Sequence, residues 1–171
     1  NNGTSISIMF HSTFLVQLLK RTCGKGSYNK RIPSFAMVAP KIFIEGLLDG
    51  YISGDGTLST KQSRITIQSR SRALRDGISL LLTKFKINTT CTEWTVPSHV
   101  KWTTNDDGSR SQELYGEEKP VYSVNIGAHG AYKLAHNVAL TLKYKQEILN
   151  GYHEPNMKKI KIQEEMQDVQ L

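Results

Sequence analysis

Three glycines at helical spacing, followed by an acid, constrain this chain more than any other feature of its sequence. Gly46, Gly50 and Gly54 recur every four residues, and the run ends on Asp55 and Gly56. Each glycine costs a helix interior roughly 1 kcal/mol relative to alanine, so a compensating contact is expected. A glycine face lets a second helix approach until the two backbones nearly touch. The pattern therefore predicts a close helix pair with Asp55 at its end, and a lone helix with a glycine C-cap is the simpler alternative.

Two such helices side by side would bring two carboxylates together at one open end. Hard divalent cations such as Mg²⁺ favour one or two carboxylates, completed by water and by substrate phosphates. Asp55 is therefore a candidate metal ligand, and Mg²⁺ is the expected cofactor.

Residues 48–56 resemble the signature helix of the LAGLIDADG homing endonucleases. The identical positions are Leu48, Gly50, Ile52, Asp55 and Gly56. The resemblance implies site-specific cleavage of double-stranded DNA and an α+β fold, an αββαββα unit with a curved antiparallel DNA-binding sheet. It also implies metal binding by Asp55 and the adjoining Gly54, and an interface through Gly46, Gly50 and Gly54 with the helix of a second repeat.

Bulk composition is compatible with this resemblance. At 171 residues the chain is long enough for one domain with a sizeable core. A formal charge of +7 suits a polyanionic partner, although charge alone also serves solubility. The two cysteines, Cys23 and Cys91, lack metal-ligand spacing, which argues against a zinc site or a disulfide framework. No apolar run approaches the ~20 residues of a membrane span and no signal pattern opens the chain, so we expect an intracellular protein of the cytoplasm or nucleus with no membrane partner.

Periodicity predicts strands and helices in alternation along the chain. The predicted strands are residues 4–10, 57–59, 64–69, 88–94 and 121–126. The predicted helices are residues 12–23 with Ser12 as N-cap, 41–53, 71–85 and 130–149. The polar stretch 97–119 is typical of a hairpin tip or a loose loop.

Residues 30–40, which precede the signature helix, are similar in motif order to endonuclease domains embedded in inteins. The resemblance implies that Lys30 lies near the scissile phosphate, where its ammonium polarises the attacking water or stabilises charge on the phosphoryl oxygens. A solvated loop lysine is the alternative. A second catalytic lysine is implied near the last helix, where Lys145, or less well Lys143, is available. A lysine at a helix C-terminus also has an explanation in the helix dipole.

The strand-then-helix order at the N-terminus recurs near the C-terminus, so the chain reads as parts of two repeats. Residues 1–40 would be the last strand and helix of a first repeat, with a linker. A second LAGLIDADG repeat would fill residues 41–152, and residues 153–171 would form a tail leading toward an intein splicing domain. The chain would then supply half of an active site, and its partner would be a missing N-terminal half or a second copy in a homodimer.

The outward faces of the strands, together with the long polar stretch, are expected to follow the major groove of DNA. Arg64 and Gln68 are best suited to bidentate contacts with base edges, although an ordinary solvent-exposed sheet face would have a similar sequence. The candidate DNA-binding residues are Ser59, Lys61, Gln62, Arg64, Thr66, Gln68, Lys101, Arg110, Ser123 and Asn125.

The function expected from these motifs is Mg²⁺-dependent hydrolysis of DNA phosphodiester bonds. The alternative is a relative that keeps the fold for binding alone, such as a DNA-binding regulator or an RNA-binding intron maturase. Asp55 favours the enzyme, because a binder gains little from that acid. A protein-interaction module that uses the glycine face only for dimerisation would leave Lys30 and the polar strand faces unexplained.

Overall fold

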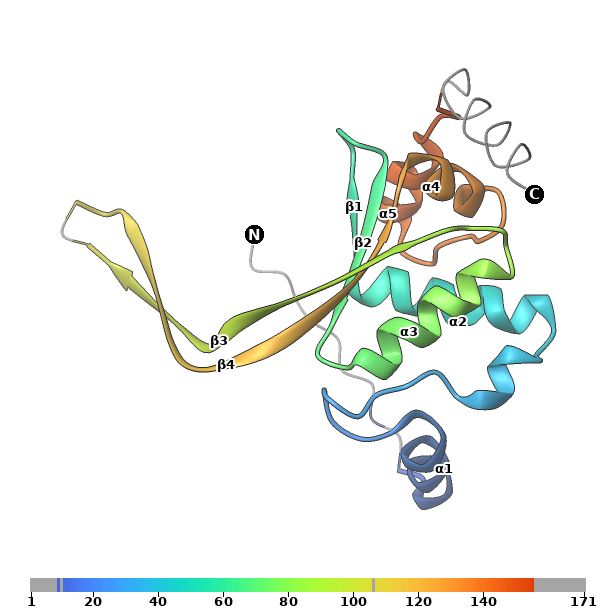
Figure 1. The fold of residues 1–171 in the computed structure, drawn as a ribbon, viewed down its shortest axis with the longest axis horizontal. Helices are drawn as coiled ribbons and strands as arrows, with labels where there is room; N and C mark the ends of the chain where they lie inside the picture. Colours follow the sequence, from blue (N-terminus) through green and yellow to red (C-terminus); the bar gives the residue numbers. More distant parts are fainter. Residues whose placement is uncertain (1–8, 10, 106, 156–171) are drawn as a thin grey trace, which may run out of the picture.

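The fold is an antiparallel sheet flanked by helices, in a computed structural model that describes residues 9, 11–105 and 107–155. The elements are α1 (Thr13–Cys23), η1 (Ser34–Met37), α2 (Lys41–Asp55), β1 (Gly56–Ser59), β2 (Arg64–Ser69), α3 (Arg72–Thr83), β3 (Thr90–Thr104), β4 (Arg110–Ile126), α4 (Ala128–Ala135) and α5 (Lys143–Asn150). From α2 to α4 the order is αββαββα, which confirms the expected fold class. Figure 1 shows β3 and β4 leaving the body of the molecule as a long curved ribbon.

The sheet has the strand order β1-β2-β4-β3, with every neighbouring pair antiparallel. Alternation in β2 is as predicted, because Ile65 and Ile67 are 0% and 2% exposed while Arg64 and Gln68 are exposed. Val124 of β4 pairs with Ile67 on the same inner face. Burying each such side chain stabilises the fold by about 1.5–3 kcal/mol.

Helix α2 has one buried stripe and one glycine face. Ile44, Leu48 and Ile52 are buried at i, i+4 and i+8. A Cβ added at Gly46, Gly50 or Gly54 would meet nothing within 4 Å. Within the part of the chain that the structure describes, the glycine face therefore has no packed neighbour, and its role as a helix interface stays a prediction.

Helix α2 runs directly into strand β1 at Gly56. A Cβ at this position would lie 2.6 Å from the carbonyl oxygen of Ile52, so only glycine fits the close approach. The last residue of the helix, Asp55, is thus covalently next to the first residue of the sheet.

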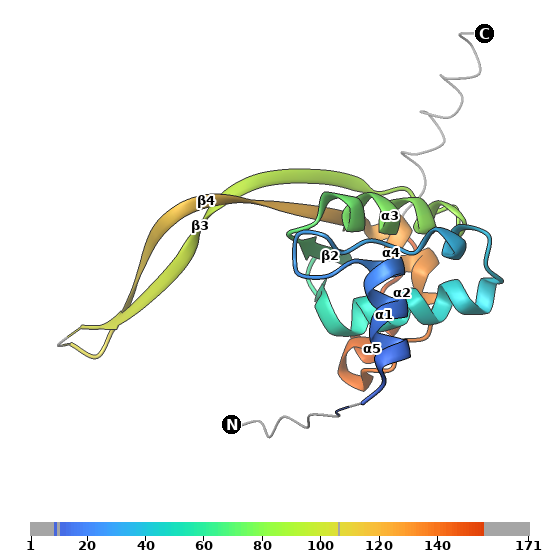
Figure 2. The ribbon, with the colours of Figure 1, turned by 90° about the horizontal axis from the view of Figure 1, so that it is seen from below.

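The stretch predicted as a hairpin tip or loose loop, residues 97–119, is mostly strand. Strands β3 and β4 stay paired from Thr90 with Asn125 to Thr104 with Arg110, and only the turn at 105–109 is a tip. Figure 2 shows this ribbon arching away from the helices. Its residues are nearly all exposed on both faces, so the apolar alternation that reveals a half-buried strand is missing.

The helix predicted at 130–149 is two short helices, α4 and α5, and the single-helix prediction was wrong. The Asn137 side chain donates to the Lys133 carbonyl (2.8 Å) at the end of α4. Val138 and Leu140 then enter the core, at 2% and 6% exposure, in a segment that is not helical. Burial of these two side chains thus interrupts a pattern that reads as continuous.

Helix α1 forms as predicted, with the Ser12 hydroxyl accepting from the Leu15 amide at 3.2 Å. None of its residues is buried, and Phe14 is 77% exposed. Arg31 holds its C-terminus by donating to the carbonyls of Arg21 (2.6 Å) and Thr22 (3.1 Å). The strand predicted at 4–10 and most of the tail from 153 lie outside the described residues.

The helices of the protein are short or polar. Across residues 9, 11–105 and 107–155, none combines the length and apolar composition that crossing a bilayer requires.

Asp49 ties α2 to the segment before α5. Its carboxylate accepts from the Thr141 amide (2.7 Å), the Thr141 hydroxyl (2.6 Å) and the Ser53 hydroxyl (2.7 Å). Burial alone would raise the pKa of this carboxyl, but the hydrogen bonds from Thr141 and Ser53 outweigh it and hold the pKa below the ordinary 3.8.

We expect Asp49→Asn to remove an acid-sensitive part of the stability. Because the native pKa lies below that of an unfolded aspartate, the contribution is fully present above pH 3.8 and is lost as the pH falls through the lower native value. Urea unfolding of wild type and variant should therefore differ at about pH 6 and converge toward about pH 2. The exposed-acid control Glu154→Gln should follow wild type throughout. A difference between wild type and Asp49→Asn that stays constant with pH would contradict the assignment.

Candidate active site and nucleic-acid interface

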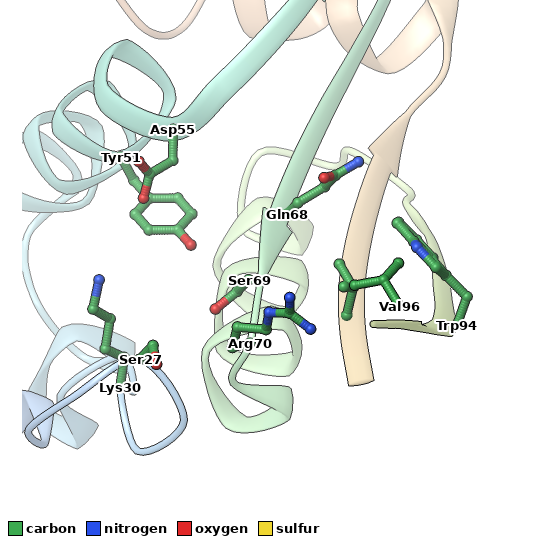
Figure 3. Close-up of a pocket in the computed structure, with 10 residues that line it drawn as sticks. Ser27, Lys30, Tyr51, Asp55, Gln68, Ser69, Arg70, Trp94 and Val96 are labelled. Carbon is green, nitrogen blue, oxygen red and sulfur yellow. The ribbon is translucent and has the colours of Figure 1, made fainter. Parts of the chain in front are cut away.

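A pocket of about 500 Å³ opens at the C-terminal end of α2, and both Lys30 and Asp55 line it. Figure 3 shows the Lys30 side chain rising from its loop toward the side of the pocket where Asp55 and Tyr51 project from α2. The full lining is Ser27, Lys30, Tyr51, Asp55, Gln68, Ser69, Arg70, Trp94, Val96 and Val121. The structure thus brings together two site residues that the sequence predicted from separate motifs.

The loop that carries Lys30 is fixed by its backbone. The buried Ser71 hydroxyl donates to the Lys30 carbonyl at 2.5 Å and also accepts from the Leu74 amide at the start of α3. On the other side, the Arg31 amide donates to the Cys23 carbonyl at 2.8 Å. Gly24 has φ +80° and packs so closely on Asn29 that no side chain fits there. Lys30 is therefore a solvent-exposed side chain on an anchored backbone.

Tyr51 is a pocket residue that the sequence analysis missed. It lies one helical turn before Asp55, and this i, i+4 spacing is the signal that could have found it. Burial raises the pKa of the Tyr51 phenol, a hydrogen bond with Ser69 lowers it, and the negative charge of Asp55 raises it. The net pKa lies above the ordinary 10.0, so at neutral pH the phenol is a hydrogen-bond donor in the pocket.

Arg70 was also missed, and it connects the pocket to β4. Its guanidinium donates to the carbonyls of Lys119 (2.8 Å) and Pro120 (3.1 Å). Trp94 lines the pocket from β3 and is 39% exposed. The pocket therefore has positive charge from both Lys30 and Arg70, and an apolar, aromatic surface at the ribbon from Trp94 and Val96.

Asp55 is the single acid among the residues that line this pocket. Across the described residues there is no group of three or more His, Cys, Asp or Glu side chains placed to hold a metal ion. One carboxylate with water and phosphate oxygens matches what Mg²⁺ accepts, so the exposed Asp55 fits as one ligand of such an ion. The role of Gly54 beside it stays a prediction.

Lys145 does not lie in the pocket, and its predicted catalytic role conflicts with the structure. It is 6% exposed, and its ammonium donates to the carbonyls of Ile52 (2.9 Å), Ser53 (2.7 Å) and Gly56 (2.7 Å). All three N–H donors are occupied at the C-terminus of α2. Lys145 is a buried cap that supports the helix bearing Asp55, whereas Lys143 is exposed at the start of α5.

The polar face of the sheet is continuous from β1 to β3. Arg64 and Gln68 are exposed on it, and between them the Thr66 hydroxyl donates to the Asn125 side chain at 3.1 Å. The Asn125 amide in turn donates to the Thr92 hydroxyl at 3.2 Å. Ser59, Lys61 and Gln62 stand at the β1–β2 turn, where the Ser59 hydroxyl accepts from the Gln62 amide.

Two residues predicted to bind DNA are placed differently from the rest. Ser123 is 1% exposed between its pairing partners Gln68 and Thr92, so it is not available to a ligand on this face. Its hydroxyl oxygen is buried, and among the residues that the structure describes it has no hydrogen-bond partner. Lys101 pairs with Glu113 on the ladder face opposite to Thr92, because side chains alternate along β3.

Positive charge is concentrated outside the ribbon. The chain has 22 basic and 15 acidic residues. Residues 90–126 contain three of the basic and six of the acidic ones, so the rest of the chain has 19 basic and 9 acidic residues. The body of the molecule is therefore more basic than the whole chain suggests, and the ribbon is acidic.

Comparison with known proteins places this geometry in a family context. The LAGLIDADG-like domain family matches residues 43–126. The probable translation initiation factor IF-2 of Methanocaldococcus jannaschii is 30% identical over 135 residues, which is 78% of this chain and 10% of that protein. The DNA-directed RNA polymerase subunit Rpo1C of the same organism is 38% identical over 89 residues, 51% of this chain and 10% of that one. A DNA polymerase of a Thermococcus species is 32% identical over 116 residues, 67% of this chain and 6% of that one, so the chain spans a tenth or less of each relative.

Proposed function

Because the chain belongs to the LAGLIDADG family, we propose that it is the DNA-cleaving domain of a homing endonuclease and supplies half of an active site for site-specific double-strand cleavage. The observation that carries this proposal is the pocket that Lys30 and Asp55 share at the end of the glycine-faced helix, next to the polar face of the sheet. Double-stranded DNA is the proposed partner, since the sheet face is polar and the body is basic.

Three of the pocket residues, Asp55, Lys30 and Tyr51, would have roles in phosphodiester hydrolysis. Asp55 would hold Mg²⁺ through its carboxylate, and the ion when bound supplies a water of lowered pKa and offsets charge on phosphate oxygens. The Lys30 ammonium would stabilise the negative charge that develops on the phosphoryl oxygens. The protonated Tyr51 would donate a hydrogen bond to the substrate beside them.

The relatives support an inserted, intein-borne origin. An initiation factor, an RNA polymerase subunit and a DNA polymerase have unrelated roles, yet each contains a segment similar to this chain within a much longer protein. A domain that recurs in this way is expected of a mobile element. Residues 1–40, 41–152 and 153–171 would then be the end of a first repeat, a second repeat and the return toward a splicing domain.

A second signature helix is needed to complete the proposed site. It would pack on Gly46, Gly50 and Gly54 and bring its own acid beside Asp55. The partner is either another repeat or a second copy of this chain.

We expect the dilute chain to cleave poorly and its cleavage to rise steeply with its concentration. The reason is that two chains must first pair through the glycine face. Plasmid cleavage with Mg²⁺ and sedimentation, measured on the same samples, test this. Gly50→Leu should block pairing and cleavage while the monomer stays folded, since a Cβ there meets nothing within 4 Å. Gly127→Ala, also in open space, is the matched control. Efficient double-strand cleavage by a proven monomer would refute the half-site proposal.

One observation favours a second candidate, a LAGLIDADG-fold DNA- or RNA-binding protein without cleavage. The pocket lining contains a single carboxylate. Such a regulator or maturase would bind nucleic acid at every concentration and cleave at none, so the same titration separates the two functions.

A further inference from the structure

The long ribbon contains one irregularity, and it changes which side chains share a face. Pairing runs regularly from Thr90 to Pro97, which pairs with Glu118, and then resumes at His99 with Tyr115. One residue of β3 therefore faces two residues of β4, Gly116 and Glu117. Gly116 has φ +92°, the left-handed conformation that glycine adopts readily at a β-bulge.

The bulge inverts the alternation of β4 relative to the rest of the sheet. Beyond it, Trp102 pairs with Gln112 and Thr104 pairs with Arg110. On β3 these pairs share the ladder face of Thr92 and Trp94, which is the polar face of the sheet. If the same residues paired regularly, without the bulge, Glu113 would lie opposite Trp102, and Gln112 and Arg110 would turn to the other face.

Acidic side chains follow the same division. The acids of the paired strands, Glu93, Glu113 and Glu118, pair with Tyr122, Lys101 and Pro97 on the opposite ladder face. Glu117 lies in the bulge. The ladder pairs on the polar face contain no acid between Thr90 and Val96, nor at Trp102 and Thr104. The three acids in regular ladder pairs thus lie off the polar face, and only Glu117 of the bulge departs from this division.

We infer that Arg110 and Gln112 read base edges at the outer part of the DNA site, and that the Gly116 bulge turns them to the DNA side. The inference rests on the proposed function and extends it to residues that set sequence specificity. A two-stranded ribbon fits the major groove, where arginine pairs with guanine and glutamine with adenine. Both side chains are exposed, and the indole of Trp102, 64% exposed beside them, offers an apolar surface to a thymine methyl group.

Selection of bound duplexes from a randomised library, with the full chain, tests this assignment. Arg110→Ala and Gln112→Ala should each flatten the preference at one or two outer base pairs and weaken binding to the best site roughly 5- to 150-fold. Lys101→Ala and Glu113→Ala, two exposed neighbours on the opposite face, are matched controls. They should leave the selected sequence unchanged.

Insertion of one residue after Ser98 is the second variant. It gives each of the two bulge residues of β4 a pairing partner, which removes the bulge and turns Arg110 and Gln112 to the opposite ladder face. The insertion should remove the preference at the same outer base pairs, while preference at the positions read by Arg64 and Gln68 remains. The inference is overturned if Lys101→Ala changes the outer preference and Arg110→Ala does not, or if the insertion after Ser98 leaves the preference intact. A wild-type chain that enriches no sequence would refute the proposed function as well, so the two failures are distinguishable.

Discussion

Asp55→Asn should lower DNA cleavage by about 10³-fold under the conditions in which the wild-type chain pairs and cleaves. Asparagine keeps the size of the side chain but removes the negative charge that would hold Mg²⁺ at the end of α2. Because the Asp55 side chain is exposed and does not belong to the core, the substitution should leave folding unchanged. DNA affinity measured without metal should also be unchanged. Cleavage rates and metal-free binding to the same duplex measure the two effects separately.

The control for this variant is Glu154→Gln, which neutralises an exposed acid outside the pocket. It should cleave like wild type. Full cleavage by Asp55→Asn would show that the acid is not the metal ligand, and an equal loss of folding would show that it is structural.

Lys145→Met should lower the free energy of unfolding by about 2–4 kcal/mol. Methionine fills the space of the buried lysine stem but leaves the carbonyls of Ile52, Ser53 and Gly56 without their donor. Those carbonyls have lost their contact with water, so their unsatisfied hydrogen-bonding capacity is costly. Urea unfolding monitored by circular dichroism measures the change.

Lys143→Met is the matched control, two residues away on the same helix and exposed. It should change stability by no more than about 0.5 kcal/mol. Equal stability of the two variants would remove the capping role assigned to Lys145.

Local pattern was enough to predict much of the fold. Helix α2 buries Ile44, Leu48 and Ile52, and strand β2 buries Ile65 and Ile67. A buried face of this kind requires apolar residues at a regular spacing, which is visible in the sequence. The ribbon has no buried face over most of its length, so no period reveals it. Its bulge at Gly116 depends on which strand residues meet, and sequence alone does not give that register.

Site residues could be predicted from the sequence where they belong to a local motif. They could not be predicted where contacts between distant parts of the chain determine their position. Lys30 and Asp55 belong to local motifs, and they line one pocket. Lys145 lies near the end of the helix predicted at 130–149, but its side chain caps a different helix, α2. Residue spacing in the sequence does not reveal that these two helices come close together. Ser123 alternates outward as expected, yet its small side chain in a central strand is covered by its neighbours.

The junction at Gly56 fixes the distance between the end of α2 and the start of the sheet. Helix α2 ends and β1 begins there without an intervening loop, and the close contact between Gly56 and the Ile52 backbone restricts movement of the junction. For the cleavage proposed above, the distance from the cut phosphate to the first base read by the sheet would then be set by the covalent geometry of this junction. Substitutions on the sheet would then change which bases are read, but not how far from them the proposed cleavage falls.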